Sequence, residues 1–271
     1  MIIDGKKLAA EIKESLKAEI SGIDKELRLA VIQVDDNPVT ERFLTQKKKF
    51  GEDIGVDVRV YELPKDISTN ALRKKVAEVV HIKQNTAVIV QLPLPNHINT
   101  QYILDGIIVE KDADVLSSKG IGMFETGRSK IIPPVVATVK YILDSNNIYV
   151  KGKNAVVVGR GRLVGKPVSI WLNNNGAAIT SIDENTLDPR PYTLSADLII
   201  SGAGKPGIIT ADMVKDGVII IDAGTSESEG RLVGDVDPSV EEKASLFTPV
   251  PGGVGPLTVA MLFKNLFTLA Q

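Results

Sequence analysis

A glycine-rich loop in the second half of the chain carries residues able to hold a phosphate. It reads Gly159-Arg160-Gly161-Arg162-Leu163-Val164-Gly165. The loop follows an apolar run, residues 155–158, and precedes a helical pattern. Glycines there let backbone N–H groups approach a pyrophosphate at the helix N-terminus, where the helix dipole favours negative charge. The spacing is one residue longer than the usual dinucleotide pattern, so the loop predicts either a dinucleotide site or an ordinary tight turn.

Two later strands of the same half end in small residues. The first is followed by Ala203 and Gly204, the second by Gly224 and Thr225. Small residues at the carboxyl ends of parallel strands let a ribose or a flat ring lie against the backbone. We therefore expect these four residues to contact the same nucleotide as the glycine-rich loop.

The residues around the loop leave the choice between NAD and NADP open. Asp183 or Glu184, at the end of the next strand, could accept a hydrogen bond from the ribose 2′-hydroxyl of NAD. Arg160 and Arg162 could instead pair with the 2′-phosphate of NADP, or could be solvated loop charges. We favour NADP through Arg160.

A lysine in the first half of the chain lies next to an apolar helix face. With 100° per residue over the helix predicted at residues 38–54, Val39, Phe43, Phe50 and Ile54 share an arc of about 60°. Lys47 lies about 20° beyond that arc. A lysine in a partly desolvated cleft has a lowered pKa and suits acid–base catalysis, whereas a lysine that only snorkels keeps its ammonium in water.

Two further polar residues interrupt apolar surroundings. Gln91 closes the buried run AVIVQ, near the carboxyl end of a predicted strand, and Asp114 follows a short apolar run in the segment KDAD. Taken singly, Gln91 could be a strand-end amide and Asp114 a turn carboxylate. Both are also candidates for a catalytic site, because functional side chains gather at the carboxyl ends of strands.

The composition excludes several classes of function. The 271 residues include 32 Lys and Arg against 34 Asp and Glu, a net charge of −2 that gives no electrostatic case for nucleic-acid binding. The absence of cysteine excludes disulfides, thiolate nucleophiles and iron–sulfur clusters. Two histidines make a multi-histidine metal site unexpected. Without a signal peptide or a membrane-length apolar run, we expect a cytoplasmic protein that binds neither metal nor membrane.

Strands and helices alternate along the chain. Strands are predicted at residues 29–34, 56–63, 87–92, 154–158, 177–182, 197–201 and 218–222, and helices at 38–54, 70–82, 135–146, 164–174 and 257–269. This alternation favours an α/β fold with parallel sheets covered by helices. The two prolines at positions 133 and 134 mark the most plausible domain boundary.

Taken together, these segments resemble the bifunctional methylenetetrahydrofolate dehydrogenase/methenyltetrahydrofolate cyclohydrolase family. The most specific match is TPVPGGVGPLTVA at residues 248–260. Shorter matches are IDGK at residues 3–6, VQLPLP at 90–95, KDAD at 111–114 and the glycine-rich loop. The resemblance covers essentially the whole chain in the right order.

The resemblance implies two α/β domains flanking a cleft, the second a Rossmann-like parallel sheet. We expect a folate-binding catalytic domain at residues 1–133 plus the C-terminal helix 256–271, and a dinucleotide-binding domain at 134–255. Lys47 matches the catalytic lysine, Gln91 the glutamine that sets its protonation state, and Asp114 the carboxylate that anchors the pterin. Implied substrate contacts are Phe43, Leu92, Pro251, Gly252 and Gly253. The family is usually a homodimer.

The implied activity has two steps. Methylenetetrahydrofolate is oxidised with NADP to the methenyl cation, which water then opens to 10-formyltetrahydrofolate. Phe43 stands where the family has tyrosine, so a dehydrogenase with weak or absent cyclohydrolase activity stays an alternative. Two further alternatives remain. A non-catalytic binding protein is disfavoured by the presence of Lys47, Gln91 and Asp114, and a dehydrogenase for an amino or hydroxy acid is disfavoured by the match at residues 248–260.

Overall fold

A computed structural model of the chain describes residues 1–35, 38–228 and 230–271, without the side chains of Pro38 and Val39. The chain divides into two compact units. The three-stranded unit comprises Ala10–Pro134 and Val259–Gln271, and the five-stranded unit comprises Met1–Ala9 and Val135–Thr258. Each contains a parallel β-sheet with helices, so the predicted α/β class is confirmed.

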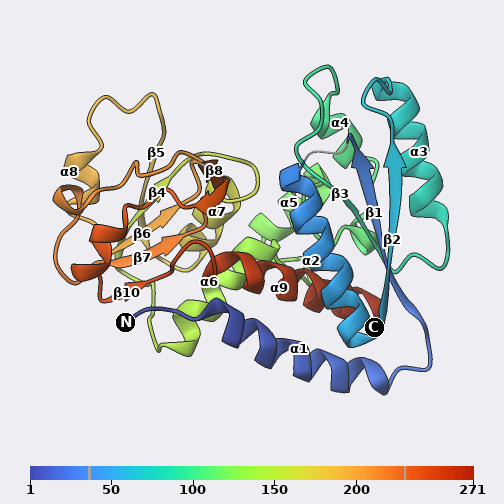
Figure 1. Cartoon of the computed structure of the whole chain (residues 1–271), viewed down its shortest axis with the longest axis horizontal. Helices are drawn as coiled ribbons and strands as arrows, with labels where there is room; N and C mark the ends of the chain where they lie inside the picture. Colours follow the sequence, from blue (N-terminus) through green and yellow to red (C-terminus); the bar gives the residue numbers. More distant parts are fainter. Residues whose placement is uncertain (36–37, 229) are drawn as a thin grey trace. The chain divides into compact units, whose positions relative to one another are not determined.

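The three-stranded unit is built on the order β2-β1-β3 (Figure 1). Its strands β1 (Leu27–Val34), β2 (Val56–Leu63) and β3 (Ala87–Val90) are parallel. Helix α2 (Pro38–Ile54) connects β1 to β2, and α3 (Thr69–His81) connects β2 to β3. The chain thus passes to opposite sides of β1, which makes the carboxyl ends of β1 and β3 a switch point where ligands of such sheets bind.

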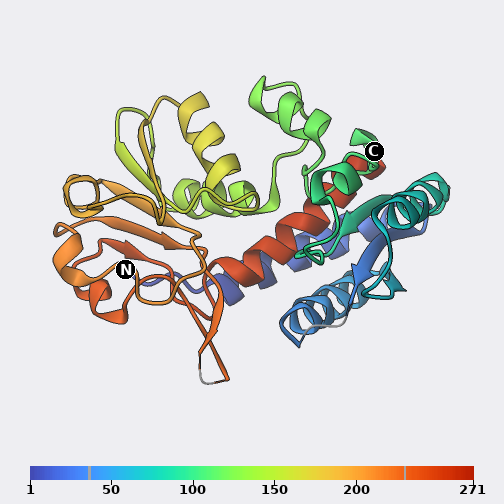
Figure 2. The same cartoon turned by 90° about the horizontal axis from the view of Figure 1, so that it is seen from above.

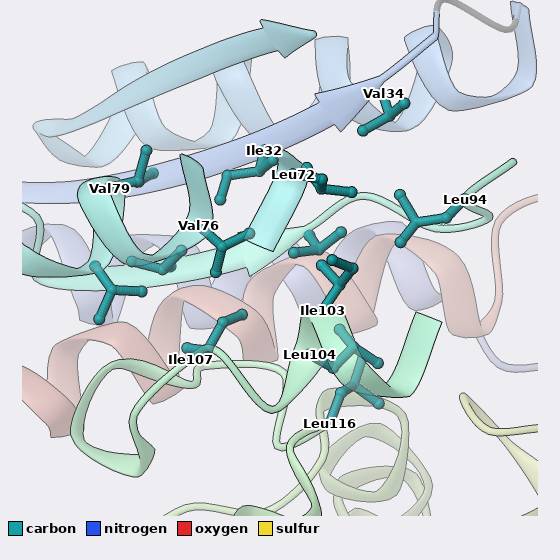
Figure 3. Packing of buried hydrophobic residues seen from close by; sticks show 14 of the residues in the cluster. Ile32, Val34, Leu72, Val76, Val79, Leu94, Ile103, Leu104, Ile107 and Leu116 are labelled. Atoms are coloured by element: carbon teal, nitrogen blue, oxygen red, sulfur yellow. The ribbon is translucent and has the colours of Figure 1, made fainter. Parts of the chain in front are cut away.

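Helices α3 and α4 (Thr100–Leu104) cover one face of this sheet. Figure 3 shows Leu72, Val76 and Val79 of α3 packed toward Ile32 of β1, with Ile103 of α4 beside them. These apolar side chains are almost fully buried. The spacing of three and four residues in α3 is the amphipathic pattern that a sheet-covering helix requires.

Helices α2 and α9 (Val254–Ala270) contact each other in the same unit. The rings of Phe50 and Phe263 are stacked with centroids 5.1 Å apart. Helix α1 (Gly5–Ser21), which the sequence analysis did not predict, joins α2 through an ion pair of 2.8 Å between Lys13 and Asp53. The structure also adds the helix α5 (Ser118–Glu125) and the 3-10 turn Val109–Lys111.

The five-stranded unit has the order β10-β7-β6-β4-β5, all parallel; its strands are labelled in Figure 1 and seen from above in Figure 2. Its strands are β4 (Asn154–Val158), β5 (Ala178–Ile182), β6 (Leu198–Ser201), β7 (Ile219–Asp222) and β10 (Leu246–Phe247). Its helices are α6 (Pro134–Ser145), α7 (Gly165–Asn174) and α8 (Arg190–Thr193), with 3-10 turns Ala211–Met213 and Pro238–Glu242. The strands β8 (Ser226–Ser228) and β9 (Arg231–Val233) form a separate antiparallel hairpin.

The first residues of the chain, Met1–Ala9, fall in the same compact unit as the five-stranded sheet. The N–H of Ile3 donates to the carbonyl of Phe247, and the N–H of Phe247 donates to the carbonyl of Met1, both at 2.9 Å. Residues 1–3 therefore extend the sheet edge beyond β10. Across the described residues, we find no helix with the length and apolar character needed to cross a membrane.

Candidate functional site

Lys47 and Gln91 are in direct contact in the three-stranded unit. The Lys47 Nζ donates a hydrogen bond of 2.7 Å to the Gln91 Oε1. Gln91 follows β3, and its N–H donates to the carbonyl of Ile32 at 2.8 Å, which extends the pairing of β1 with β3 by one step. Its side-chain Nε2 donates to the Leu92 carbonyl at 3.1 Å. The amide is thereby held with its oxygen toward Lys47.

The surroundings of the Lys47 ammonium differ from those of a snorkelling lysine. Lys47 lies between two sets of residues on α2: the apolar arc predicted from the sequence, and the buried residues Thr40, Leu44 and Gly51 on its other side. Lys47 therefore lies within the buried face of α2, not at its margin. The side chain of Val39, a member of the predicted apolar arc, is outside the described residues. Burial lowers the pKa of Lys47, and the charge of Asp114 partly opposes this shift.

Asp114 lies close enough to Lys47 for the two charges to interact. Burial raises the pKa of Asp114 to about 6, the Lys47 ammonium opposes the shift, and the Asp112 carboxylate adds to it. A lysine with a lowered pKa next to a carboxyl group with a raised pKa is typical of an acid–base site. The structure therefore brings together Lys47, Gln91 and Asp114, which are far apart in the sequence.

Two residues that the sequence analysis missed hold Asp114 in place. The buried Asp112 carboxylate accepts hydrogen bonds from the N–H groups of Ser117 at 2.8 Å and Leu116 at 3.2 Å. Asn265 of α9 donates through Nδ2 to the carbonyls of Ala113 and Ile132, both at 2.8 Å. A buried Asn within an apolar helix was the available signal for the second contact.

A pocket of about 470 Å³ opens at the switch point of the three-stranded sheet. Gln33 at the end of β1 and Gln91 after β3 both line it. The Gln33 Nε2 donates to the Glu41 carboxylate at 2.8 Å, while its buried Oε1 has no hydrogen-bond partner among the described residues. The pocket thus lies where an open parallel sheet binds ligands.

The two predicted substrate contacts of this unit adjoin Lys47 and Gln91. Phe43 is half-buried one helical turn before Lys47 on α2. Leu92 is half-buried directly after Gln91. Both positions suit apolar contact with a flat substrate, and Phe43 has no hydroxyl to offer to Lys47.

The glycine-rich loop joins β4 to α7 in the five-stranded unit, as predicted. Gly159 has φ of +95°, a conformation that L side chains rarely adopt. A Cβ on Gly165 would lie 1.8 Å from the Gly159 carbonyl oxygen, so only glycine permits the close approach. Gly161 is exposed, whereas Val164 packs on Gly202, the first residue after β6.

The loop also lies at the switch point of its sheet. Helix α7 leads from β4 to β5 on one side, and the chain then crosses to β6 on the other side of β4. Ala203 and Gly204 after β6 are exposed at this edge. After β7, Gly224 is buried and Thr225 is exposed. Small residues around a helix N-terminus fit the pyrophosphate and ribose of a dinucleotide.

Arg160 and Asp183 form an ion pair at the end of β5. The Arg160 Nη1 lies 3.3 Å from the Asp183 carboxylate, and its Nη2 donates to the Ser181 carbonyl at 2.7 Å. Glu184 is exposed, and Arg162 is half-buried. The two residues that pointed to different nucleotides are therefore partners of each other.

The remaining predicted substrate contacts belong to the five-stranded unit. Pro251 is exposed, Gly252 is half-buried with φ of +108°, and Gly253 is buried. The Gly253 N–H donates to the Pro249 carbonyl at 2.8 Å and closes a tight turn before α9.

Two family models match the chain. "Tetrahydrofolate dehydrogenase/cyclohydrolase, catalytic domain" matches residues 3–114, and "Tetrahydrofolate dehydrogenase/cyclohydrolase, NAD(P)-binding domain" matches residues 133–271. The "Bifunctional protein FolD" of Nitratiruptor sp. is 41% identical over 275 residues, covering 100% of this chain and 98% of the relative.

Two solved structures share the fold over the whole chain. The bifunctional FolD methylenetetrahydrofolate dehydrogenase/cyclohydrolase of Campylobacter jejuni has a TM-score of 0.93 and 39% identity, covering 100% of this chain and 98% of that one. The Trypanosoma brucei methylenetetrahydrofolate dehydrogenase-cyclohydrolase, complexed with NADP and an inhibitor, has a TM-score of 0.95 and 32% identity, covering 100% and 97%.

Proposed function

The chain belongs to the tetrahydrofolate dehydrogenase/cyclohydrolase family, and from this premise we propose how its own residues perform the two steps. The protein oxidises 5,10-methylenetetrahydrofolate and hydrolyses the resulting 5,10-methenyltetrahydrofolate to 10-formyltetrahydrofolate. The observation that carries the assignment of residues is the contact between Lys47 and Gln91 beside Asp114.

The first step depends on the nucleotide, and the five-stranded unit fits it. The fit rests on the backbone approach at Gly165, the helix N-terminus behind it and the exposed small residues after β6. When bound, the nucleotide supplies the acceptor for the hydride that leaves the methylene carbon of the folate. The residues of the chain orient the folate and exclude water, which accelerates the step without acid–base work by a side chain.

In the second step Lys47 handles the proton of the attacking water. Burial lowers the pKa of Lys47 and so favours its free amine, which accepts a proton as the water oxygen bonds to the methenyl carbon. The ammonium then returns the proton to N5 of the folate as the bond from that nitrogen to the carbon breaks. The hydroxyl proton passes to solvent as the formyl carbonyl forms, so one proton is released overall. Gln91 holds the Lys47 Nζ in place throughout.

Asp114 holds the pterin in both steps. A carboxyl group with a pKa of about 6 presents acceptor oxygens to the ring N–H groups when ionised and can donate when protonated. Phe43 and Leu92 supply apolar contact beside the reacting carbon. Pro251, Gly252 and Gly253 form a turn that contacts the substrate.

We assign NADP as the preferred nucleotide, with Arg160 as the partner of its 2′-phosphate. The guanidinium is held at the end of β5 by Asp183, where the 2′ position of the ribose binds in such sheets. Contacts to the remainder of the nucleotide come from the loop residues Gly159, Gly161, Arg162, Val164 and Gly165, and from Glu184, Ala203, Gly204, Gly224 and Thr225.

Both activities can be measured on the purified chain. We expect NADPH to form with methylenetetrahydrofolate, and the methenyl cation to disappear faster than its spontaneous hydrolysis when no nucleotide is present. Dehydrogenase activity without cyclohydrolase activity would favour a monofunctional enzyme, and absence of both would favour a binding protein. We also propose that the chain is a cytoplasmic homodimer, which light scattering of the purified protein tests for the oligomeric state.

A further inference from the structure

Two buried carboxyl groups lie side by side at the carboxyl edge of the five-stranded sheet, outside the residues assigned so far. Asp222 ends β7 and is 2% exposed, and Asp235 follows β9 and is 0% exposed. The Gly224 backbone contacts both carboxyl groups, and the charge of Asp235 contributes to the raised pKa of Asp222. Buried carboxylates are costly unless their oxygens accept hydrogen bonds, so the partners of these groups identify their role.

Both oxygens of Asp235 accept hydrogen bonds from the end of β6 and the loop after it. Its Oδ2 accepts from the Ser201 Oγ at 2.6 Å and from the Ala203 N–H at 2.7 Å. Its Oδ1 accepts from the Lys205 N–H at 2.8 Å. Ala203 and Lys205 are exposed, so this buried carboxylate fixes an otherwise solvent-facing loop from beneath.

The same carboxyl group packs against the loop after β7. A Cβ on Gly224 would lie 2.1 Å from the Asp235 Cγ, so the glycine backbone rests directly on the carboxyl group. The Gly224 N–H donates to the Asp222 Oδ1 at 2.9 Å, and the Val236 N–H donates to the Asp222 Oδ2 at 2.9 Å. The two loops that follow neighbouring strands are thus tied to one carboxyl pair.

We propose that Asp235 is a positioning residue for nucleotide binding, which sets the backbone of residues 202–205 and of Gly224 in the form that receives the nucleotide. The inference rests on the proposed function, because it takes Ala203, Gly204, Gly224 and Thr225 as nucleotide contacts. Asp235 touches no ligand itself and acts only through the loops that it holds.

The replacement Asp235→Asn tests this role with little change of volume. The amide nitrogen of the new asparagine donates hydrogen bonds and cannot accept one. In one orientation it meets the Ala203 N–H and the Ser201 hydroxyl, and in the other it meets the Lys205 N–H, so a donor faces a donor either way. Nucleotide binding must then order a loosened loop. Loss of a hydrogen bond to a charged acceptor corresponds to a roughly tenfold or larger change in an equilibrium constant.

The experiment compares the full-length wild type with Asp235→Asn and with Asp237→Asn. Asp237 is a matched control because its carboxylate also accepts a backbone hydrogen bond, from the Ser239 N–H at 2.9 Å, but at the start of the 3-10 turn Pro238–Glu242. Calorimetric titration gives the Kd for NADP, and decay of the methenyl cation without nucleotide gives the cyclohydrolase rate. We expect Asp235→Asn to raise the Kd about tenfold with an unchanged cyclohydrolase rate, and Asp237→Asn to change neither.

Other outcomes separate the possible failures. An unchanged Kd in Asp235→Asn, or an equal loss of NADP binding and cyclohydrolase rate, would overturn the inference while leaving the proposed function in place. If Asp235→Asn does not fold, Ser201→Ala removes a single contact: a Kd raised about threefold supports the inference and an unchanged Kd overturns it. A wild type that binds no NADP would overturn the proposed function, and this inference with it.

Discussion

The Lys47 ammonium and the Gln91 side-chain oxygen lie 2.7 Å apart, which links the buried face of α2 to the carboxyl end of β3. The partner of this half-buried lysine is a neutral amide. An amide oxygen fixes the position of the nitrogen without strongly stabilising its charge, whereas a carboxylate would do both. The pair therefore holds a lysine whose pKa is lowered by burial and is available for proton transfer.

Gln91→Glu tests the importance of a neutral partner. The new carboxylate would stabilise the Lys47 ammonium and raise its pKa. We expect the pH profile of the cyclohydrolase rate to move to higher pH, with little activity near neutrality. Gln46→Glu on the exposed side of α2 serves as the control and should leave the profile unchanged. A profile that stays in place in Gln91→Glu would contradict this role.

Phe43→Tyr is expected to increase the cyclohydrolase rate. Residue 43 lies one turn before Lys47 on α2, so a phenol hydroxyl there can reach the ammonium. One added hydrogen bond corresponds to a rate increase of about fivefold, measured as kcat for methenyl hydrolysis. The KM for the folate should change little, since the ring itself is retained. A decrease in kcat would show that the phenyl ring is required as it stands.

Asp114→Asn is expected to stabilise the fold while weakening folate binding. The pKa of Asp114 in the folded chain, about 6, lies above the ordinary value of 3.8. Folding therefore favours the neutral form of the Asp114 carboxyl group. The free energy of unfolding is highest below pH 3.8 and falls as the pH rises toward 6. An asparagine avoids this loss.

The stability effect is read from thermal unfolding at two pH values. Near neutral pH the Tm of Asp114→Asn should exceed that of the wild type by a few degrees, and near pH 4 the difference should shrink. The exposed Asp66→Asn should show no such pH-dependent difference. Equal Tm differences at both pH values would argue against burial of the Asp114 charge.

Asp183→Asn tests the assignment of the nucleotide. The change releases Arg160 from a charge 3.3 Å away and makes the guanidinium available to a 2′-phosphate. We expect kcat/KM with NADP to rise by about fivefold and kcat/KM with NAD to fall. Asp188→Asn, five residues further along, is a suitable control. A shift toward NAD would show that Asp183 positions Arg160 for the 2′-phosphate and does not compete with that phosphate for the guanidinium.

Much of the fold follows from local pattern. The helix predicted at residues 38–54 has the same bounds in the structure, because a clear 3.6-residue pattern begins at a proline and ends before an alternating strand. The family resemblance, which rests mainly on residues 248–260, is confirmed by both family models and by full-length relatives. Helix α1 was missed, although Ile12, Leu16 and Ile20 recur at a four-residue spacing.

The details of the site depend on relations between distant segments. Lys47 was expected at the margin of the apolar arc, but Leu44 and Gly51 extend the buried face around it. At Gly51 this face packs on Val56 and Val58 of β2, with Phe263 of α9 beside them. The role of Asp235 follows from the pairing of β6 with β7, which places Ser201 opposite Asp222. No local pattern shows which loops will meet at the ends of neighbouring strands.

The central claim is that Lys47 transfers the proton in methenyl hydrolysis. The most direct measurement is the cyclohydrolase rate of Lys47→Met, with the dehydrogenase rate measured in the same preparation and the exposed neighbour Lys48→Met as control. We predict that Lys47→Met lowers the cyclohydrolase rate about a hundredfold or more and keeps part of the dehydrogenase rate, while Lys48→Met retains both. Retention of the full cyclohydrolase rate in Lys47→Met would contradict the account.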